Sequence, residues 1–304
     1  MTALAIVLAV LGAALSAVGI QLQAAGVRDE SRDDGLRLRG LARLARNRVW
    51  LLGLGVLSVC AVLQILALAL APVTVVAPIV VLALPVSVVL NTRLSGARLD
   101  AAASLAVVAS SGGVALFVAL AAGAAKPVVF ASEDVLQAVE LVALAVVLLG
   151  LTGAVSQGVT RCVAFAAGTG SAYGLVSVLV RDVTYSFQNG GPGAVPPLSV
   201  AGLVLAFAGG SWLLQLAYAS GPPDVVVGCQ TVLNPLVATA LGIGLLNETV
   251  NAGGWRGVGL VAGGVTAIVG VIILARHRPG GRQVLAGQEP GGESGSSSSA
   301  SSVR

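Results

Sequence analysis

The strongest constraint on this chain is a series of nine apolar stretches, each about twenty residues long and almost free of charge. They cover residues 3–23, 50–70, 72–91, 101–121, 135–155, 162–180, 198–218, 225–245 and 257–274. A helix needs roughly 20 apolar residues to cross the hydrocarbon of a bilayer. Bilayer hydrocarbon offers backbone groups no water, so only helices and closed barrels span it, and these runs lack the alternation of barrel strands. The sequence therefore predicts an all-α, polytopic membrane protein with nine transmembrane helices.

The composition excludes the other broad classes of protein. Hydrophobic residues make up 56 % of the chain and charged residues only 10 %, whereas a soluble domain carries about 25 % charged residues. Intrinsic disorder needs low hydrophobicity, and the 40 glycines have no period of three, which excludes a collagen-like chain. Cys60, Cys162 and Cys229 all fall inside apolar stretches. We therefore interpret them as small core residues and not as a disulfide or zinc framework.

The distribution of basic residues predicts the orientation. The loops after the first, third, fifth and ninth stretches hold fourteen of the 17 lysines and arginines, and the opposite side holds Lys126, Arg181 and Arg256. The positive-inside rule then places the N-terminus outside and the C-terminus in the cytoplasm of a bacterial inner membrane. The first stretch could instead be a signal peptide, but no basic residue precedes Arg28 and the apolar run is too long, so we expect a true span. Arg181 and Asp182 are expected to face water at the outer side.

An internal repeat is the next feature of the chain. Pro72 and Pro222 are 150 residues apart, as are Pro85 and Pro235. The following pairs also recur in the same order: Ser16-Ala17-Val18-Gly19 with Ser171-Ala172-Tyr173-Gly174, and Gly112-Gly113-Val114 with Gly263-Gly264-Val265. Chance matching in a chain rich in alanine, valine, leucine and glycine is the alternative.

The repeat predicts how the domain is organised. We expect repeat one over residues 3–121, a linking helix over 135–155 and repeat two over 162–274, all within a transmembrane domain of residues 1–275. Residues 276–304 are rich in glycine and serine and are expected to form a disordered cytoplasmic tail. Four helices plus one linking helix is an odd number of spans, so the second copy starts on the opposite side of the membrane and is inverted. Inverted repeats are typical of secondary transporters with sites near mid-membrane.

Several ordered motifs resemble a known family. Residues 12–23, GAALSAVGIQLQ, precede a basic loop, and residues 50–55, 63–72, 214–219 and 233–235 follow as WLLGLG, LQILALALAP, LQLAYA and LNP. Over about residues 3–275 the chain resembles the NIPA-like members of the drug/metabolite transporter superfamily. The resemblance implies a helical transporter built of inverted repeats. The magnesium-transporting branch often has an acidic residue after the third helix, where this chain has Thr92-Arg93, although Glu248 keeps the acid in the second half.

Polar residues inside the spans are the candidate substrate-binding residues, because an unsatisfied polar group facing lipid is costly. The candidates for a cavity between the halves are Gln64, Tyr173, Gln215, Gln230 and Asn234. Gln230 and Asn234 are four residues apart and share a helix face, and Pro235 frees a backbone carbonyl one turn earlier. The alternative role of the amides is to join helices, at about 0.6 kcal/mol each, and Tyr173 could simply pack between its neighbouring glycines.

Two carboxylates are candidates for coupling transport to an ion. Glu140 lies in the fifth apolar stretch and Asp224 at the start of the eighth. Burial would raise the proton affinity of either group. The alternatives are that Glu140 reaches the outer interface and that Asp224 caps its helix.

The function expected from the sequence is transport and not catalysis. His277, the one histidine, lies between two arginines, there is no Walker loop, and no cluster of metal-ligating residues occurs, so no cofactor or metal is expected. We expect a secondary transporter that moves a small polar or amphipathic metabolite by alternating access, with protons or a cation as candidate coupling ions. The alternatives are a permease for magnesium or another divalent cation, and a non-transporting membrane scaffold. The expected partners are the substrate and the lipid bilayer, with no nucleic acid, and an oligomer is left open.

Overall fold

The computed structural model describes residues 2–30, 43–70, 83–95, 101–122, 132–244 and 254–277. Within these ranges the chain forms nine α-helices and one short 3-10 helix, and it contains no strand. The helices are α1 (Thr2–Glu30), α3 (Arg48–Leu70), α5 (Ala83–Ser95), α6 (Ala101–Ala122), α7 (Ser132–Val155), α8 (Gly158–Gly190), η1 (Pro192–Ala194), α9 (Pro197–Ser220), α10 (Pro223–Gly244) and α11 (Trp255–His277). The all-α prediction is confirmed.

Eight of these helices are long and apolar enough to cross a membrane. They correspond to eight of the nine predicted spans, which makes the chain a multi-pass helical membrane protein. The remaining predicted span, residues 72–91, is only partly described: its second half belongs to α5, which has 13 residues. The first half of that span and the tail beyond His277 lie outside the described residues.

The helix that contains Arg181 and Asp182 differs from the prediction. α8 has 33 residues, a length of about 50 Å, whereas the bilayer hydrocarbon is about 30 Å thick. The helix continues past the expected boundary because the Asp182 carboxylate is buried, where it accepts a hydrogen bond of 2.6 Å from the Ser199 hydroxyl of α9. The prediction that Asp182 faces water is therefore wrong, and Arg181 is half-buried.

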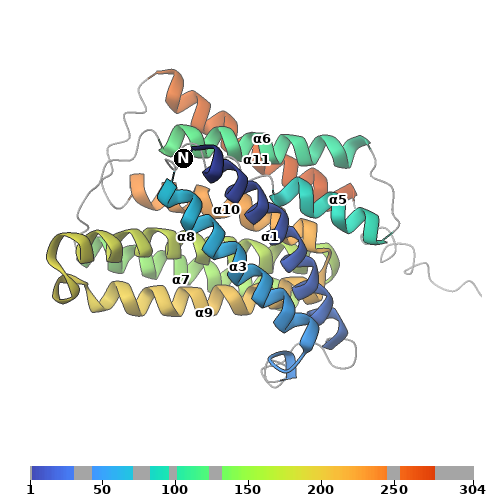
Figure 1. Cartoon of the computed structure of the whole chain (residues 1–304), viewed down its shortest axis with the longest axis horizontal. Coiled ribbons are helices and arrows are strands. Elements are labelled where there is room, and N and C mark those ends of the chain that lie inside the picture. The colour runs from blue at the N-terminus through green and yellow to red at the C-terminus, as the bar shows by residue number, and fades with distance from the viewer. Residues whose placement is uncertain are drawn as a thin grey trace, which may run out of the picture.

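The helices form two groups with α10 between them (Figure 1). α7, α8 and α9 lie side by side on one flank, and α6 packs along α11 on the other. The pair of α1 and α3 runs diagonally across the front in this view, and α1 also packs on α5. The largest buried apolar cluster draws side chains from α1, α5, α6, α8, α9, α10 and α11. α10 is thus the helix around which the rest of the bundle is arranged.

Close helix contacts occur at glycines, which allow two backbones to approach. A methyl group on Gly113 of α6 would lie 2.7 Å from the carbonyl oxygen of Gly263 in α11, and a methyl group on Gly263 would lie 3.0 Å from the carbonyl oxygen of Gly113. A methyl group on Gly174 of α8 would lie 2.9 Å from the carbonyl oxygen of Asn234 in α10. The interfaces α6–α11 and α8–α10 therefore depend on the absence of a side chain at these positions.

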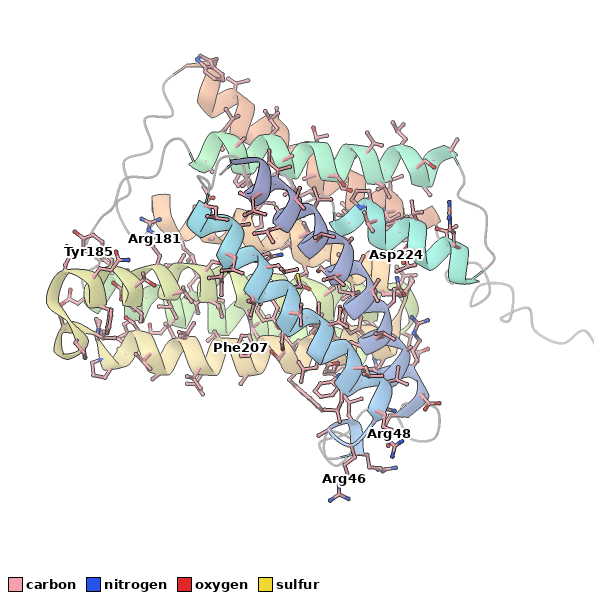
Figure 2. All side chains as sticks on the ribbon, viewed as in Figure 1. Arg46, Arg48, Arg181, Tyr185, Phe207 and Asp224 are labelled. Carbon is pink, nitrogen blue, oxygen red and sulfur yellow. The ribbon has the colours of Figure 1, made fainter. Side chains whose placement is uncertain are left out.

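Arginines gather at one end of the bundle. Figure 2 places Arg46, Arg48 and Asp224 at that end, and it places Arg181 and Tyr185 at the opposite end. Two contacts join helix termini at this end. Arg43 forms an ion pair with Glu30 at 3.6 Å, and the Cys162 side chain at the start of α8 lies against Gly221 after α9. We call this end, with Arg28, Arg43, Arg46, Arg48 and Arg161, the arginine-rich end.

Candidate functional site

The two halves of α10 have different surroundings. Every residue from Pro223 to Cys229 is buried, so the first half of the helix is enclosed on all sides. From Gln230 to Ala240 every residue except Val232 is partly or fully exposed. Residues 225–247 contain no aspartate, glutamate, lysine, arginine or histidine. The accessible half of α10 therefore carries uncharged polar groups among apolar ones, and it lies in the central helix of the bundle.

Three side chains and one carbonyl form the polar part of this half, which we call the amide cluster: Gln230 and Asn234 of α10, Ser177 of α8, and the carbonyl of Thr231. The Asn234 Oδ1 atom accepts a hydrogen bond of 3.0 Å from the Ser177 hydroxyl. Pro235 lies inside the helix and has no N–H, so it leaves the Thr231 carbonyl without its helical partner. The Gln230 amide forms no hydrogen bond with any described residue. The cluster thus offers both donors and acceptors to a polar solute.

Close helix packing fixes the cluster in place. Methyl groups on Gly170 and Gly174 would lie 2.7 Å from the Leu233 Cβ and 2.8 Å from the Val237 Cβ, respectively. α8 and α10 are therefore in backbone contact on both sides of Asn234. The same hydroxyl of Ser177 also lies 2.9 Å from the carbonyl of Tyr173 in its own helix, so the two acceptors share its one proton, which restrains the hydroxyl near Asn234.

Tyr173 turns toward α9 and is not part of the amide cluster. Its hydroxyl lies 3.1 Å from the Ser211 hydroxyl, and its ring stacks on Phe207 with centroids 6.0 Å apart. The ring also packs against Gly210, where a methyl group would lie 3.0 Å from it. These contacts favour the packing role of Tyr173 over substrate contact.

The two glutamines in near-equivalent repeat positions have different environments. Gln64 of α3 is half-buried, lies beside Gly12 of α1, and donates to the Cys60 sulfur at 3.5 Å. Gln215 of α9 is buried and accepts a hydrogen bond of 3.2 Å from the Trp50 indole of α3. Neither contact joins the amide cluster. The described contacts therefore bring together Asn234 and Ser177, place Gln230 one turn away, and locate Gln64 and Gln215 elsewhere.

The coupling candidates also differ. Glu140 is exposed on α7. Asp224 is fully buried and is close enough to interact electrostatically with Arg28 of α1. Asp224 is not a helix cap: α10 begins at Pro223, and the Pro222 carbonyl accepts from the amides of Val225 and Val226. Its carboxylate lies in the first helical turn, where the helix dipole favours a negative charge.

A metal or cofactor finds few ligands among the described residues. They contain no group of three or more histidine, cysteine or acidic side chains that could hold a metal ion. The chemistry available at α10 is hydrogen bonding by amides, a hydroxyl and a carbonyl. Ser177 and Trp50 were not predicted as site residues from the sequence. The available signal for Ser177 was its position one turn after Tyr173 in an otherwise apolar segment.

Comparisons with protein-family models, with curated proteins and with solved structures gave no match for this chain. The geometry of the bundle and of α10 is therefore the basis for any statement about function.

Proposed function

We propose that this chain is a secondary transporter that moves a small polar or amphipathic metabolite across the membrane by alternating access. The observation that carries the proposal is the contrast along α10: a packed first half is followed by an accessible half with the amide cluster. An interior helix with accessible polar groups in a membrane bundle is typical of a solute pathway. The resemblance of the sequence to NIPA-like drug/metabolite transporters agrees with this proposal.

The proposal includes two inverted repeats, with α1, α3, α5 and α6 in the first and α8, α9, α10 and α11 in the second. Their packing supports it: α1 lies on α3 and α5, and correspondingly α8 lies on α9 and α10. A pseudo-two-fold axis would superpose one half on the other. Where two corresponding helices pack against each other, this axis passes between their equivalent residues. The reciprocal contact of Gly113 with Gly263, one residue from the pairing of Gly113 with Gly264 in the sequence repeat, is consistent with such an axis between α6 and α11.

The register of the helix pairs also supports the repeat. Gly12 of α1 lies beside Gln64 of α3, and Gly168 of α8 lies beside Leu213 of α9. By the spacings of the sequence repeat, Gly12 corresponds to residue 167 and Gln64 to about residue 215. These positions are within two residues of Gly168 and Leu213, which form the contact in the second half. The proposed orientation places the arginine-rich end in the cytoplasm of a bacterial inner membrane, because basic residues remain on the inner side.

A ligand screen followed by transport measurement tests the function. The purified full-length protein is heated with a panel of neutral metabolites, organic ions and Mg²⁺, since a ligand that binds the folded state raises the melting temperature. Each compound that stabilises the protein is then tested for uptake into proteoliposomes. We expect an uncharged or zwitterionic polar metabolite to be stabilising and transported, and Asn234→Leu to abolish both effects while the ligand-free melting temperature stays near that of the wild type.

Thr152→Val is the matched control, because Thr152 is an exposed polar residue of α7 that bonds only within its own helix, to the Leu148 carbonyl at 2.8 Å. This variant should bind and transport as the wild type does. Stabilisation and uptake of Mg²⁺ alone would favour the divalent-cation permease. Binding and transport that survive Asn234→Leu would show that the amides only join helices.

A further inference from the structure

The polar contacts at the arginine-rich end connect the first and second halves of the chain. The indole N–H of Trp50, in the first turn of α3, donates to the side-chain oxygen of Gln215 near the end of α9 at 3.2 Å. These residues are 165 positions apart. Arg28, at the end of α1, interacts electrostatically with Asp224 at the start of α10.

The second-half members of these contacts are buried, whereas Trp50 is partly buried and Arg28 is exposed. Gln215 and Asp224 are buried, with Asp224 fully inaccessible, and so are Ala217, Tyr218 and Val226 around them. Trp50 is held in place because α1 has a glycine beside it: a methyl group on Gly26 would lie 2.8 Å from the Trp50 Cβ. A solute that moved from the accessible half of α10 toward this end would meet these buried side chains.

The opposite end has a different arrangement. Its buried carboxylate, Asp182, bonds to Ser199, so that contact joins α8 to α9 within the second half. Beside it, the second half of α10 is accessible from Gln230 to Ala240 except at Val232. Among the described residues, polar contacts between the halves are thus found at the arginine-rich end.

We propose that the arginine-rich end is a gate, closed in this structure, in which the Trp50–Gln215 hydrogen bond holds the two halves together and the electrostatic attraction between Arg28 and Asp224 assists it. Opening breaks the hydrogen bond and separates the start of α3 from the end of α9 and the end of α1 from the start of α10. The role of this gate in solute passage rests on the proposed transport function, but the separation of the helices can be measured without any substrate.

Spin labels at exposed sites on the two halves provide that measurement. Arg46→Cys in the first half and Thr160→Cys in the second report the distance across the arginine-rich end, while Leu66→Cys and Gln188→Cys report the distance across the opposite end. The native thiols Cys60, Cys162 and Cys229 are buried, so the introduced cysteines are the ones that react. Distances are recorded by pulsed electron paramagnetic resonance on the full-length protein in nanodiscs.

The wild type should show one short distance between the labels at residues 46 and 160. Trp50→Phe keeps an aromatic ring but removes the indole donor, and Asp224→Asn keeps the side-chain shape but removes the charge. Each should add a longer distance at this end, with an increase of about fivefold in the open population, and the double variant should increase it further. Ser199→Ala breaks the contact within the second half and should leave this distance unchanged.

The proposal is overturned if neither variant changes the distance at the arginine-rich end, or if Ser199→Ala changes it as much. Equal broadening at both label pairs would mean general loosening and would also overturn it. The outcome is separable from the transport test: a gate that opens in a protein with no transported solute contradicts the function alone, and an unchanged distance in a protein whose transport depends on Asn234 contradicts the gate alone.

Discussion

Among the described residues, the two ends of the bundle bury one carboxylate each, but the two carboxylates have different partners. Asp182, at the opposite end, accepts a hydrogen bond from the Ser199 hydroxyl of the neighbouring helix in the same half. Asp224, at the arginine-rich end, lies within electrostatic range of Arg28 of the other half. A carboxylate that bonds inside one half stabilises that half as a unit, whereas one that pairs across the halves stabilises a particular arrangement of them.

The surroundings of α10 follow the same division. Its first half, near Asp224, is enclosed on all sides, and its second half is accessible along most of its length. In a bundle that is packed equally tightly throughout, burial would be similar along the whole of the central helix. The comparison suggests that α8 and α9 form a fixed frame and that the contacts from α1 and α3 are the ones that change.

Removing the hydroxyl of Ser199 should have the largest effect on stability. Ser199 and Asp182 are both buried, at 0 % and 4 % exposure, so Ser199→Ala leaves a carboxylate with one donor fewer in an enclosed site. Hydrogen bonds to charged groups contribute about 1.5–3 kcal/mol, and we expect a loss of that size in unfolding experiments in detergent. Ser220→Ala is the control in the same helix, because its hydroxyl bonds only to the Leu216 carbonyl, and it should cost much less.

A methyl group at Gly174 should have the next largest effect. It would lie 2.9 Å from a backbone oxygen of Asn234 and 2.8 Å from the Val237 Cβ, and neither atom can turn away as the end of a flexible side chain could. We expect Gly174→Ala to destabilise the protein by about 1–3 kcal/mol and to weaken ligand binding at the amide cluster. Gly112→Ala, where a methyl group meets no atom within 4 Å, should be neutral or slightly stabilising. Equal melting temperatures for the two variants would contradict the close contact of α8 and α10.

The spans could be predicted because their signal is local. A run of about twenty apolar residues is sufficient to identify a membrane helix, and eight of the predicted stretches are such helices. The end of α8 could not be predicted in this way. Asp182 marked a boundary in the sequence, but its burial depends on a hydroxyl 17 residues later in the next helix, and no local pattern contains that partner.

The candidate site could be predicted only in part, for the same reason. Gln230 and Asn234 share a face of α10 because helical periodicity follows from their spacing alone. Gln215 looked equivalent to Gln64, but its hydrogen bond comes from Trp50, 165 residues away. The cost of a polar group in lipid favours an interior position for it, but that preference does not say which interior neighbour each polar residue meets.

The smallest expected effect on stability comes from the interhelical hydrogen bond of Ser177, which can be distinguished from a serine hydrogen bond within one helix. Ser177 and Ser58 are both exposed, and each hydroxyl donates to the carbonyl four residues earlier at 2.9 Å. Only Ser177 also contacts another helix, through the Asn234 Oδ1 atom at 3.0 Å. Interhelical hydrogen bonds in membranes contribute about 0.6 kcal/mol on average, so Ser177→Ala should destabilise the protein by about that much more than Ser58→Ala. In the Asn234→Leu background the difference should vanish, because the acceptor is already gone. A difference that persists without Asn234 would mean that Ser177 acts within α8 alone, and the accessible half of α10 would then lack its link to the fixed frame.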